Sequence, residues 1–429
     1  MKVKSNYDFV ILGAGIVGLS IARELRRREP DASVLVLEKE SRPGRHASGR
    51  NSGVLHSGIY YPPETLKAKV CSDGAREMAE YHEQHGLPLL RLGKVLVATS
   101  EEDAPQLELL AQRARSHGIA VEELDEQHLR EFEPEARSAT GRALWVPTTA
   151  VGSPGAVMQQ MKADIEGLGV DLSCGIEIGA VDTDRRRVLL RDGGPIGFEH
   201  AINAAGLHAD RIAHMFGVGQ RYTLLPFKGI YWKLDPDAGL DIRHLIYPVP
   251  DLRVPFLGVH TTTAVDGTIY LGPTAVPAFG RENYHGLQDV SMREFVRITG
   301  LLMRQFVSGR DGFRRLAWQE GRRYFKPWFV QAARASLPRL QASHLIPAEK
   351  VGIRAQMLDR RTGKMVTDFL VEHGPHSTHV SNAISPAFTS AFLFARYVRD
   401  NFLGRDSSES QRHETCTGGW SRPDRLAYG

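Results

Sequence analysis

Three glycines near the N-terminus and an acidic residue further on have the spacing of a site for the phosphates and ribose of a dinucleotide. Gly13, Gly15 and Gly18 form a Gly-x-Gly-x-x-Gly pattern, and Glu38 stands 20 residues after the last glycine. The first glycine permits a tight turn, the second lets the backbone approach a pyrophosphate, and the third lets helix and strand pack closely. The acid accepts hydrogen bonds from a ribose. The alternative is a βαβ unit whose glycines serve packing alone.

A second stretch follows at 46–61 whose residue types can take part in binding or catalysis. Here Gly, Ser and Asn surround two histidines and two tyrosines. It has no helical or strand period that would bury a core. Small polar residues with many backbone donors suit a segment that lies along the ribityl chain and ring of a flavin. Because it directly follows the dinucleotide pattern, we interpret it as part of a site rather than as a surface loop.

The elements that position these residues are predicted by the flanking sequence. Residues 7–12 form a short apolar run rich in branched side chains, typical of a buried parallel strand. Residues 19–28 read as a helix whose N-terminal amides face the anion, and 34–37 as the next strand. The complete order is far more specific than the glycines alone. Its place at the start of the chain favours FAD over NAD.

Composition limits the classes of protein to which the chain can belong. At 429 residues, with 42% hydrophobic and 24% charged residues, a soluble globular protein of two domains is expected. A net charge of +4, spread along the chain, argues against a nucleic-acid partner. The three cysteines lie far apart without metal-ligand spacing, so reduced thiols and no metal site are expected. Without a signal peptide or a membrane-spanning run, we expect a cytoplasmic protein, with peripheral contact at the inner face of the membrane as an option.

Periodicity and turn residues predict the remaining elements. Helices are expected over 63–84, 102–117, 125–132, 155–168, 291–306 and 312–337, strands over 94–98, 143–146, 171–181 and 198–206, and an antiparallel sheet over 222–271. We predict a discontinuous FAD-binding domain over 1–90, 151–221 and 346–403. The substrate domain is predicted over 91–150 and 222–345, and a flexible tail over 404–429.

Several motifs taken together carry a family resemblance. They are the glycine pattern, NSGVLHSGIYY at 51–61, LKAK at 66–69, IYPVPD at 246–251, PFLGVH at 255–260 and GIRAQ at 352–356. Over about residues 7–400 the chain resembles the L-2-hydroxyglutarate dehydrogenase/oxidase family of D-amino-acid-oxidase-like FAD flavoproteins. The resemblance implies an α/β fold, with a Rossmann-like FAD-binding domain and an interleaved α+β substrate domain built on an antiparallel sheet. It also implies oxidation of L-2-hydroxyglutarate to 2-oxoglutarate, with a quinone, another membrane acceptor or oxygen taking the electrons.

Two single positions and two segments depart from the family pattern. Arg50 replaces a usual histidine, and Lys228 replaces the arginine of Pro-Phe-Arg-Gly. Residues 382–388 read NAISPAF instead of NAPSPAA, and 150–153 read AVGS where the family has Gly-Ile-Val and a hydroxyl residue. The flavin interpretation is unaffected, but the substrate stays open. An amino acid, an amine or a larger hydroxy acid is the alternative substrate, and a flavoprotein that serves only as an interaction module is the alternative from another class.

Oxidising a 2-hydroxy acid requires a base for the hydroxyl proton, a hydride acceptor, and cations for the carboxylates. A histidine of near-neutral pKa suits the base, with His56 as first candidate and His260 as second. Arg354 is the candidate for a bidentate carboxylate clamp. The alternatives are structural hydrogen bonds for the histidines and an interior ion pair for the arginine. Lesser substrate candidates are Tyr60, Lys228, Tyr247 and Arg253.

The predicted cofactor contacts come from the glycine turn, the second strand, the loop after it and the segments that return beside it. They are Gly13, Gly15, Ile16, Gly18, Glu38, Lys39, Ser48, Arg50, Asn51, Ser52, Gly53, Ile178, Ala205, Gly206, Arg354, Asn382, Ser385, Pro386 and Ala387. We expect the flavin to be bound non-covalently, although His46 and His56 are residue types to which a flavin can be attached.

Residues 322–330 mix four aromatic residues with three cations in nine positions. Such a segment is able to insert Trp328 and Phe329 at a lipid headgroup boundary while its basic residues meet anionic lipid. The alternative is that the aromatic side chains fill the core between helices, since Pro327 interrupts a clean amphipathic helix.

Overall fold

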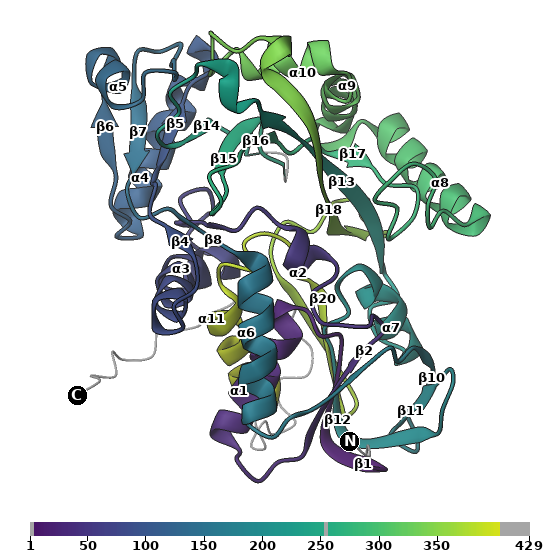
Figure 1. Cartoon of the computed structure of the whole chain (residues 1–429). Coiled ribbons are helices and arrows are strands. Elements are labelled where there is room, and N and C mark those ends of the chain that lie inside the picture. Colours follow the sequence, from purple (N-terminus) through teal and green to yellow (C-terminus); the bar gives the residue numbers. More distant parts are fainter. Residues whose placement is uncertain (1–3, 253–255, 404–429) are drawn as a thin grey trace.

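The computed structural model describes residues 4–252 and 256–403. The elements form two parts, one above the other in Figure 1. The lower part is built on an eight-stranded sheet, and the upper part contains a five-stranded and a four-stranded sheet. The predicted tail over 404–429 and the candidate Arg253 lie outside the described residues.

The eight-stranded sheet has the glycine-bearing strand at its centre. Strand β1 (Asn6–Leu12) pairs in parallel with β2 (Val34–Glu38) on one side and with β12 (Pro195–Asn203) on the other. The sheet continues through β9 (Asp171–Cys174), β10 (Ile178–Asp182), β11 (Arg187–Leu190), β19 (Leu370–Gly374) and β20 (Ser377–Asn382). Because β1, β2 and β12 are parallel, their carboxyl ends meet at one edge, where ligands of open α/β sheets bind.

Helices bury the faces of this sheet. One face packs against α1 (Ile16–Arg28), α6 (Pro154–Gly167) and α11 (Ala391–Val398), with α3 (Leu66–Gln84) behind α11. The other face carries the small helix α7 (Ala209–Met215), next to which Phe216 packs against Phe198. In α1 the apolar residues Leu19, Ala22 and Leu25 are buried, and the last turn carries three arginines that suit the negative end of a helix.

The upper part is organised by two long antiparallel strands, β13 (Tyr222–Leu234) and β18 (Leu345–Asp359). Strands β15 (His260–Thr263), β16 (Ile269–Gly272) and β17 (Val276–Pro277) complete their sheet. The four-stranded sheet contains β14 (Leu245–Pro248), β5 (Lys94–Val97), β7 (Ala143–Val146) and β6 (Glu122–Leu124), and a small sheet joins β3 (Val54–Leu55), β8 (Ala150–Gly152) and β4 (Leu89–Leu90).

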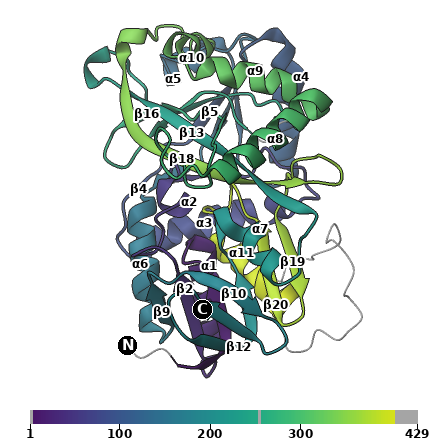
Figure 2. The same ribbon diagram turned by 90° about the vertical axis from the view of Figure 1, so that its right-hand side faces the viewer.

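Five helices cover the sheets of the upper part. In Figure 2, α8 (Met292–Ser308) and α9 (Phe313–Arg323) lie over the five-stranded sheet, with α10 (Lys326–Ala333) beside α9. Helices α4 (Ala104–Ser116) and α5 (Glu126–Phe132) accompany the four-stranded sheet. Within the two described stretches, no helix combines the length and the apolar character that crossing a membrane requires.

Four sequence expectations differ from the structure. The strand expected over 171–181 is two strands, because Gly175 has φ +76° and donates its N–H to the carbonyl of Glu40. The helix expected over 312–337 is divided into α9 and α10, with Pro327 in the first turn of α10. Not all pairing over 222–271 is antiparallel, since β14 pairs in parallel with β5. The loop at 46–61 contains a short helix, α2 (Ala47–Arg50), as well as β3.

Candidate functional site

A cavity of about 890 Å³ lies where the two parts meet. Its lower wall is formed by the carboxyl ends of β1, β2 and β12 and by the loop that contains α2. Its upper wall is formed by β14, β15 and the middle of β18. The cavity therefore combines the edge of the sheet at which a dinucleotide is expected with residues from both upper sheets.

The glycine turn has the backbone geometry that the sequence pattern requires. Gly13 has φ +110°, and a Cβ there would lie 2.6 Å from the carbonyl oxygen of Ala204. A Cβ on Gly18 would lie 2.0 Å from the carbonyl oxygen of Gly13, so Gly18 serves close packing. Gly15 is the N-cap of α1 and has no side-chain cap, and a Cβ there would approach only the Ser48 hydroxyl, at 3.1 Å. The N-terminus of α1 lines the cavity, and Gly15 brings no side chain between its amides and a ligand, which fits a pyrophosphate.

The end of β2 is held by hydrogen bonds and ion pairs. Glu38 accepts the Ala14 N–H on Oε2 at 2.8 Å and the Glu40 N–H on Oε1 at 2.9 Å, which leaves lone pairs on both oxygens for a ribose. Lys39 bridges the carboxylates of Glu40 and Glu282. Although these two acids and His46 lie close enough together to suggest a metal site, both carboxylates are already paired with the ammonium of Lys39.

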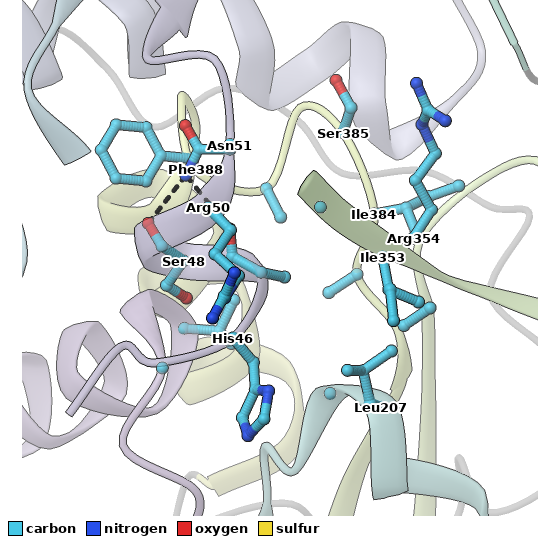
Figure 3. A pocket seen from close by; sticks show the side chains of 18 of the residues that line it. His46, Ser48, Arg50, Asn51, Leu207, Ile353, Arg354, Ile384, Ser385 and Phe388 are labelled. Carbon is cyan, nitrogen blue, oxygen red and sulfur yellow. Dashed lines mark hydrogen bonds between the residues drawn. The ribbon is translucent and has the colours of Figure 1, made fainter. Parts of the chain in front are cut away.

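The loop at 46–53 lines one side of the cavity in Figure 3, with Leu207, Ile353 and Ile384 opposite. Ser48 Oγ accepts the Ile16 N–H at 2.9 Å, and Asn51 donates to the carbonyl of Ser48 at 2.7 Å. The Arg50 guanidinium stacks 4.0 Å from the ring centroid of Tyr284. Both ring nitrogens of His46 have partners, the Tyr284 hydroxyl at 2.8 Å and Glu40 at 3.0 Å. The loop is therefore fixed by its own contacts before any ligand is bound.

The two candidate bases line the same cavity, together with Tyr60 and Tyr247. The Nδ1–H of His260 donates to the carbonyl of Gly258 at 2.7 Å, which leaves Nε2 as an acceptor, and the ring stacks on Tyr247 with centroids 4.0 Å apart. His56 Nδ1 is buried and has no hydrogen-bond partner in the described part of the chain. These two imidazoles are the acceptors available for a substrate proton.

The electrostatics of the candidate bases differ from the sequence expectation. Burial, with smaller effects from Lys94 and His260, lowers the pKa of His56 to about 3. Burial also lowers the pKa of His260 to about 4, although the hydrogen bond to Gly258 acts in the opposite direction and raises this pKa. The near-neutral pKa expected of a base is thus not found in the ligand-free cavity. A bound anion would raise both values, because an opposite charge nearby favours the imidazolium.

Arg354 reaches the cavity from the middle of β18 and is labelled in Figure 3. Its guanidinium donates to the carbonyl of Thr274 at 3.1 Å and lies 5.4 Å from the ring centroid of Phe256. Across residues 4–252 and 256–403, no carboxylate lies within ion-pair distance of it. Burial lowers the pKa of Arg354, yet an arginine stays protonated in proteins. A half-buried cation without an ion-pair partner among the described residues suits the binding of an anion.

Several predicted site residues do not line the cavity. Lys228 donates its Nζ to Asn283 at 3.1 Å instead of facing the site. Asn382 is fully buried and donates to the carbonyl of Asp368 at 2.7 Å, so its amide supports β18 and β20 rather than the cofactor. Gly18 and Gly53 act through packing, since a Cβ on Gly53 would lie 2.2 Å from the carbonyl oxygen of Gly152. The other described candidates line the cavity.

Two lysines at the site are absent from the predicted residues. Lys67 lines the cavity, and its Nζ lies 5.6 Å from the ring centroid of Tyr61, while burial lowers its pKa to about 8. Lys94 lies behind the cavity wall in β5. The sequence pattern could have identified both lysines, because each is a cation among apolar residues. Lys67 lies on the buried side of α3, and Lys94 lies in the fully buried strand KVLV.

Comparisons with known proteins agree with this geometry. The family described as FAD dependent oxidoreductase matches residues 8–401. An L-2-hydroxyglutarate dehydrogenase of Escherichia coli (strain K12) is 36% identical over 400 residues, which cover 91% of this chain and 92% of that protein. The mitochondrial L-2-hydroxyglutarate dehydrogenase of Bos taurus is 34% identical over 427 residues, with 94% and 89% covered.

Solved structures share the fold at low sequence identity. L-alpha-glycerophosphate oxidase from Mycoplasma pneumoniae, with FAD bound, has a TM-score of 0.72 at 20% identity and covers 92% of this chain and 94% of that one. Glycine oxidase from Geobacillus kaustophilus has a TM-score of 0.67 at 19% identity, with the same two coverages. The predicted fold class is confirmed by these likenesses.

Proposed function

Because this chain belongs to the family of FAD-dependent oxidoreductases, we propose that it oxidises a 2-hydroxy acid, L-2-hydroxyglutarate, to the corresponding 2-oxo acid. FAD is the cofactor, and when bound it supplies the hydride acceptor, flavin N5. The N-terminus of α1 fits its pyrophosphate, the free lone pairs of Glu38 fit its ribose, and the fixed loop at 46–53 fits its ring.

The main support for this substrate is the position of the Arg354 guanidinium. This half-buried guanidinium lines the cavity and has no ion-pair partner in the described chain, so a substrate carboxylate would supply one. Lys67 is a second cation on the same cavity, which suits an acid with two carboxylates. The imidazoles of His56 and His260 are the acceptors for the hydroxyl proton, with His56 as our first choice.

The substrate proposal is tested by anaerobic reduction of the bound flavin with a panel of acids. L-2-Hydroxyglutarate should reduce the flavin faster than L-lactate, which lacks the second carboxylate. Stopped-flow absorbance of the flavin gives both rates. Equal rates would remove the dicarboxylate assignment. Faster reduction by an amino acid or an amine would favour the alternative substrate class.

An Arg354→Lys variant supplies the matched arm of this experiment. Lysine keeps the charge but lacks the planar fork that binds a carboxylate through two hydrogen bonds. The variant should therefore bind L-2-hydroxyglutarate more weakly while its FAD content stays unchanged. Lys228→Arg, at a lysine outside the cavity lining, should leave both properties unchanged.

We also propose that the surface formed by α8, α9 and α10 contacts an anionic membrane, where a quinone would accept the electrons. Ten large apolar side chains on these helices and their connections are exposed: Met292, Phe295, Val296, Met303, Phe306, Val307, Trp318, Tyr324, Phe325 and Trp328. Basic residues accompany them, and Arg322 stacks 3.4 Å from the ring centroid of Trp328. Apolar side chains mixed with cations suit the headgroup boundary.

The burial of individual residues changes the design of the membrane test. Phe329, expected at the headgroup boundary, is 0% exposed and packs in the core with Val330, so its substitution would destabilise the fold. Phe325 and Trp328 are exposed and are the residues to replace. The protein should co-sediment with anionic liposomes at low salt and less at high salt, because screening weakens the attraction of the cations.

The double variant Phe325→Ala with Trp328→Ala should abolish this co-sedimentation. Leu189→Ala, at an exposed apolar residue of β11 in the lower part that does not line the cavity, is the control and should bind as the wild type does. Absence of pelleting at low salt, or undiminished pelleting of the double variant, would refute the membrane contact. Oxygen would then be the acceptor to test.

A further inference from the structure

Lys94 is a fully buried lysine directly behind the wall of the cavity. Its side chain is 0% exposed, and its Nζ has no hydrogen-bond partner in the described chain. The Nζ lies 4.4 Å from the ring centroid of Tyr60 and 5.7 Å from that of Tyr247, and both tyrosines line the cavity. An unpartnered polar group in the interior is costly, so its retention in β5 calls for a role.

The groups that surround Lys94 do not neutralise it. Tyr60 follows β3, Tyr247 belongs to β14, and burial raises the pKa of both phenols well above the ordinary value, so they stay neutral. Cys71 of α3 is the third group, and burial raises the pKa of its thiol to about 12. His56 and His260 complete the surroundings, and each has its pKa lowered in part by Lys94. No carboxylate in the described chain forms an ion pair with this amine.

We propose that Lys94 is a positioning residue that takes up one proton from solvent when an anionic substrate fills the cavity, and that the resulting ammonium holds Tyr60 and Tyr247 against the substrate by cation–π contact. This inference rests on the proposed function, because it requires an anion in the cavity. Burial lowers the pKa of Lys94 to about 7, so much of the amine is neutral at mildly alkaline pH. A negative charge nearby favours the ammonium and so draws in a proton.

Proton uptake by Lys94 would change the rigidity of the cavity wall. A neutral amine limits the cost of burying Lys94 behind the cavity wall, since an unpaired buried charge is strongly unfavourable. The ammonium forms only when the substrate supplies the opposite charge. Its attraction to the faces of two aromatic rings is strongest where water is excluded, as it is here. The wall of the cavity would therefore become more rigid on substrate binding.

The test measures the protons taken up when glutarate binds to the FAD-loaded protein. Glutarate has two carboxylates but no hydroxyl group, so it is not oxidised. Calorimetric titration at about pH 8 in buffers of different ionisation heat gives the number of protons, and the flavin absorbance reports binding. Uptake near one proton is expected for the wild type and near zero for Lys94→Met, which keeps an unbranched side chain without a charge.

A matched control is available elsewhere in the molecule. Lys350 also lies over two tyrosine rings, 5.6 Å from that of Tyr231 and 4.8 Å from that of Tyr270, but it is partly exposed and does not line the cavity. Lys350→Met should take up protons as the wild type does. Lys94→Gln provides a second neutral variant if Lys94→Met does not fold.

The outcomes separate this inference from the proposed function. Binding of glutarate with equal proton uptake by wild type and Lys94→Met, or with no uptake by the wild type, would overturn the role of Lys94 alone. If glutarate does not bind but propionate does, which has one carboxylate and no hydroxyl group, the dicarboxylate proposal fails, and the same proton count with propionate still decides the role of Lys94. If neither acid perturbs the flavin, both proposals fall.

Discussion

The His56→Gln variant is expected to keep its FAD and to lose roughly 10²-fold or more in the rate of flavin reduction, the usual contribution of a general base. His56 lines the cavity, and its imidazole is neutral in the ligand-free protein because burial lowers its pKa to about 3. It is therefore ready to accept a proton at neutral pH once the substrate anion raises that pKa. Anaerobic stopped-flow reduction with saturating L-2-hydroxyglutarate measures the loss.

Two histidine variants accompany this experiment. His244→Gln is the control, since His244 stacks on Phe132 in the upper part and does not line the cavity. His260→Gln tests the second candidate, whose Nε2 is an acceptor because its Nδ1–H is donated to Gly258. A normal rate for His56→Gln with a slow His260→Gln would transfer the role of base to His260. Normal rates for both would show that neither imidazole takes the proton.

The Gly15→Val variant is expected to fold and to lose its FAD. A Cβ at Gly15 meets only the hydroxyl of Ser48 within the protein. The main steric clash of the valine side chain is therefore with the pyrophosphate. Gly13→Ala should instead damage both folding and FAD binding, because Gly13 has φ +110° and its Cβ would meet the backbone of Ala204. FAD released from the purified proteins, together with their thermal unfolding, distinguishes the two effects.

Gly155→Ala is the control for these glycine variants. It lies in the first turn of α6, where an added Cβ meets no atom within 4 Å, so folding and FAD content should match the wild type. A yellow Gly15→Val protein with the FAD content of the wild type would contradict the assignment of the α1 N-terminus to the pyrophosphate.

The sequence predicted the structure best where an element is determined by its own residues. The strand, glycine turn, helix and acid of residues 6–38 were predicted in order, because turn geometry and buried strands leave clear residue patterns. Long amphipathic helices such as α3 and α6 were also found within a few residues of their ends. The cavity brings together His56, His260 and Arg354, which are distant in sequence but were each predicted as site residues.

Features that depend on tertiary contacts were not predictable from local patterns. The break between β9 and β10 depends on Gly175, whose N–H bonds to the carbonyl of Glu40, just after β2 and more than a hundred residues earlier. The low pKa values of His56 and His260 result from burial by several elements, which no local pattern reports. Lys228 and Asn382 were predicted as site residues because they lie in segments that match family motifs, but their side chains bond elsewhere.

Strand β18 approaches the loop of α2 and carries Arg354 on the same short stretch of backbone. A Cβ on Gly352 would lie 3.0 Å from the carbonyl oxygen of Arg50, so the strand passes this loop in close contact, and Arg354 follows two residues later. Two residues of strand span about 6.6 Å. The separation between the cofactor-side loop and the Cα of Arg354 is thus set by the backbone, and only rotation of the arginine side chain changes the reach of its guanidinium. Homologues that accept longer or shorter acids would gain that length through side chains, on this strand or on the opposite wall, with the backbone of the strand left unchanged.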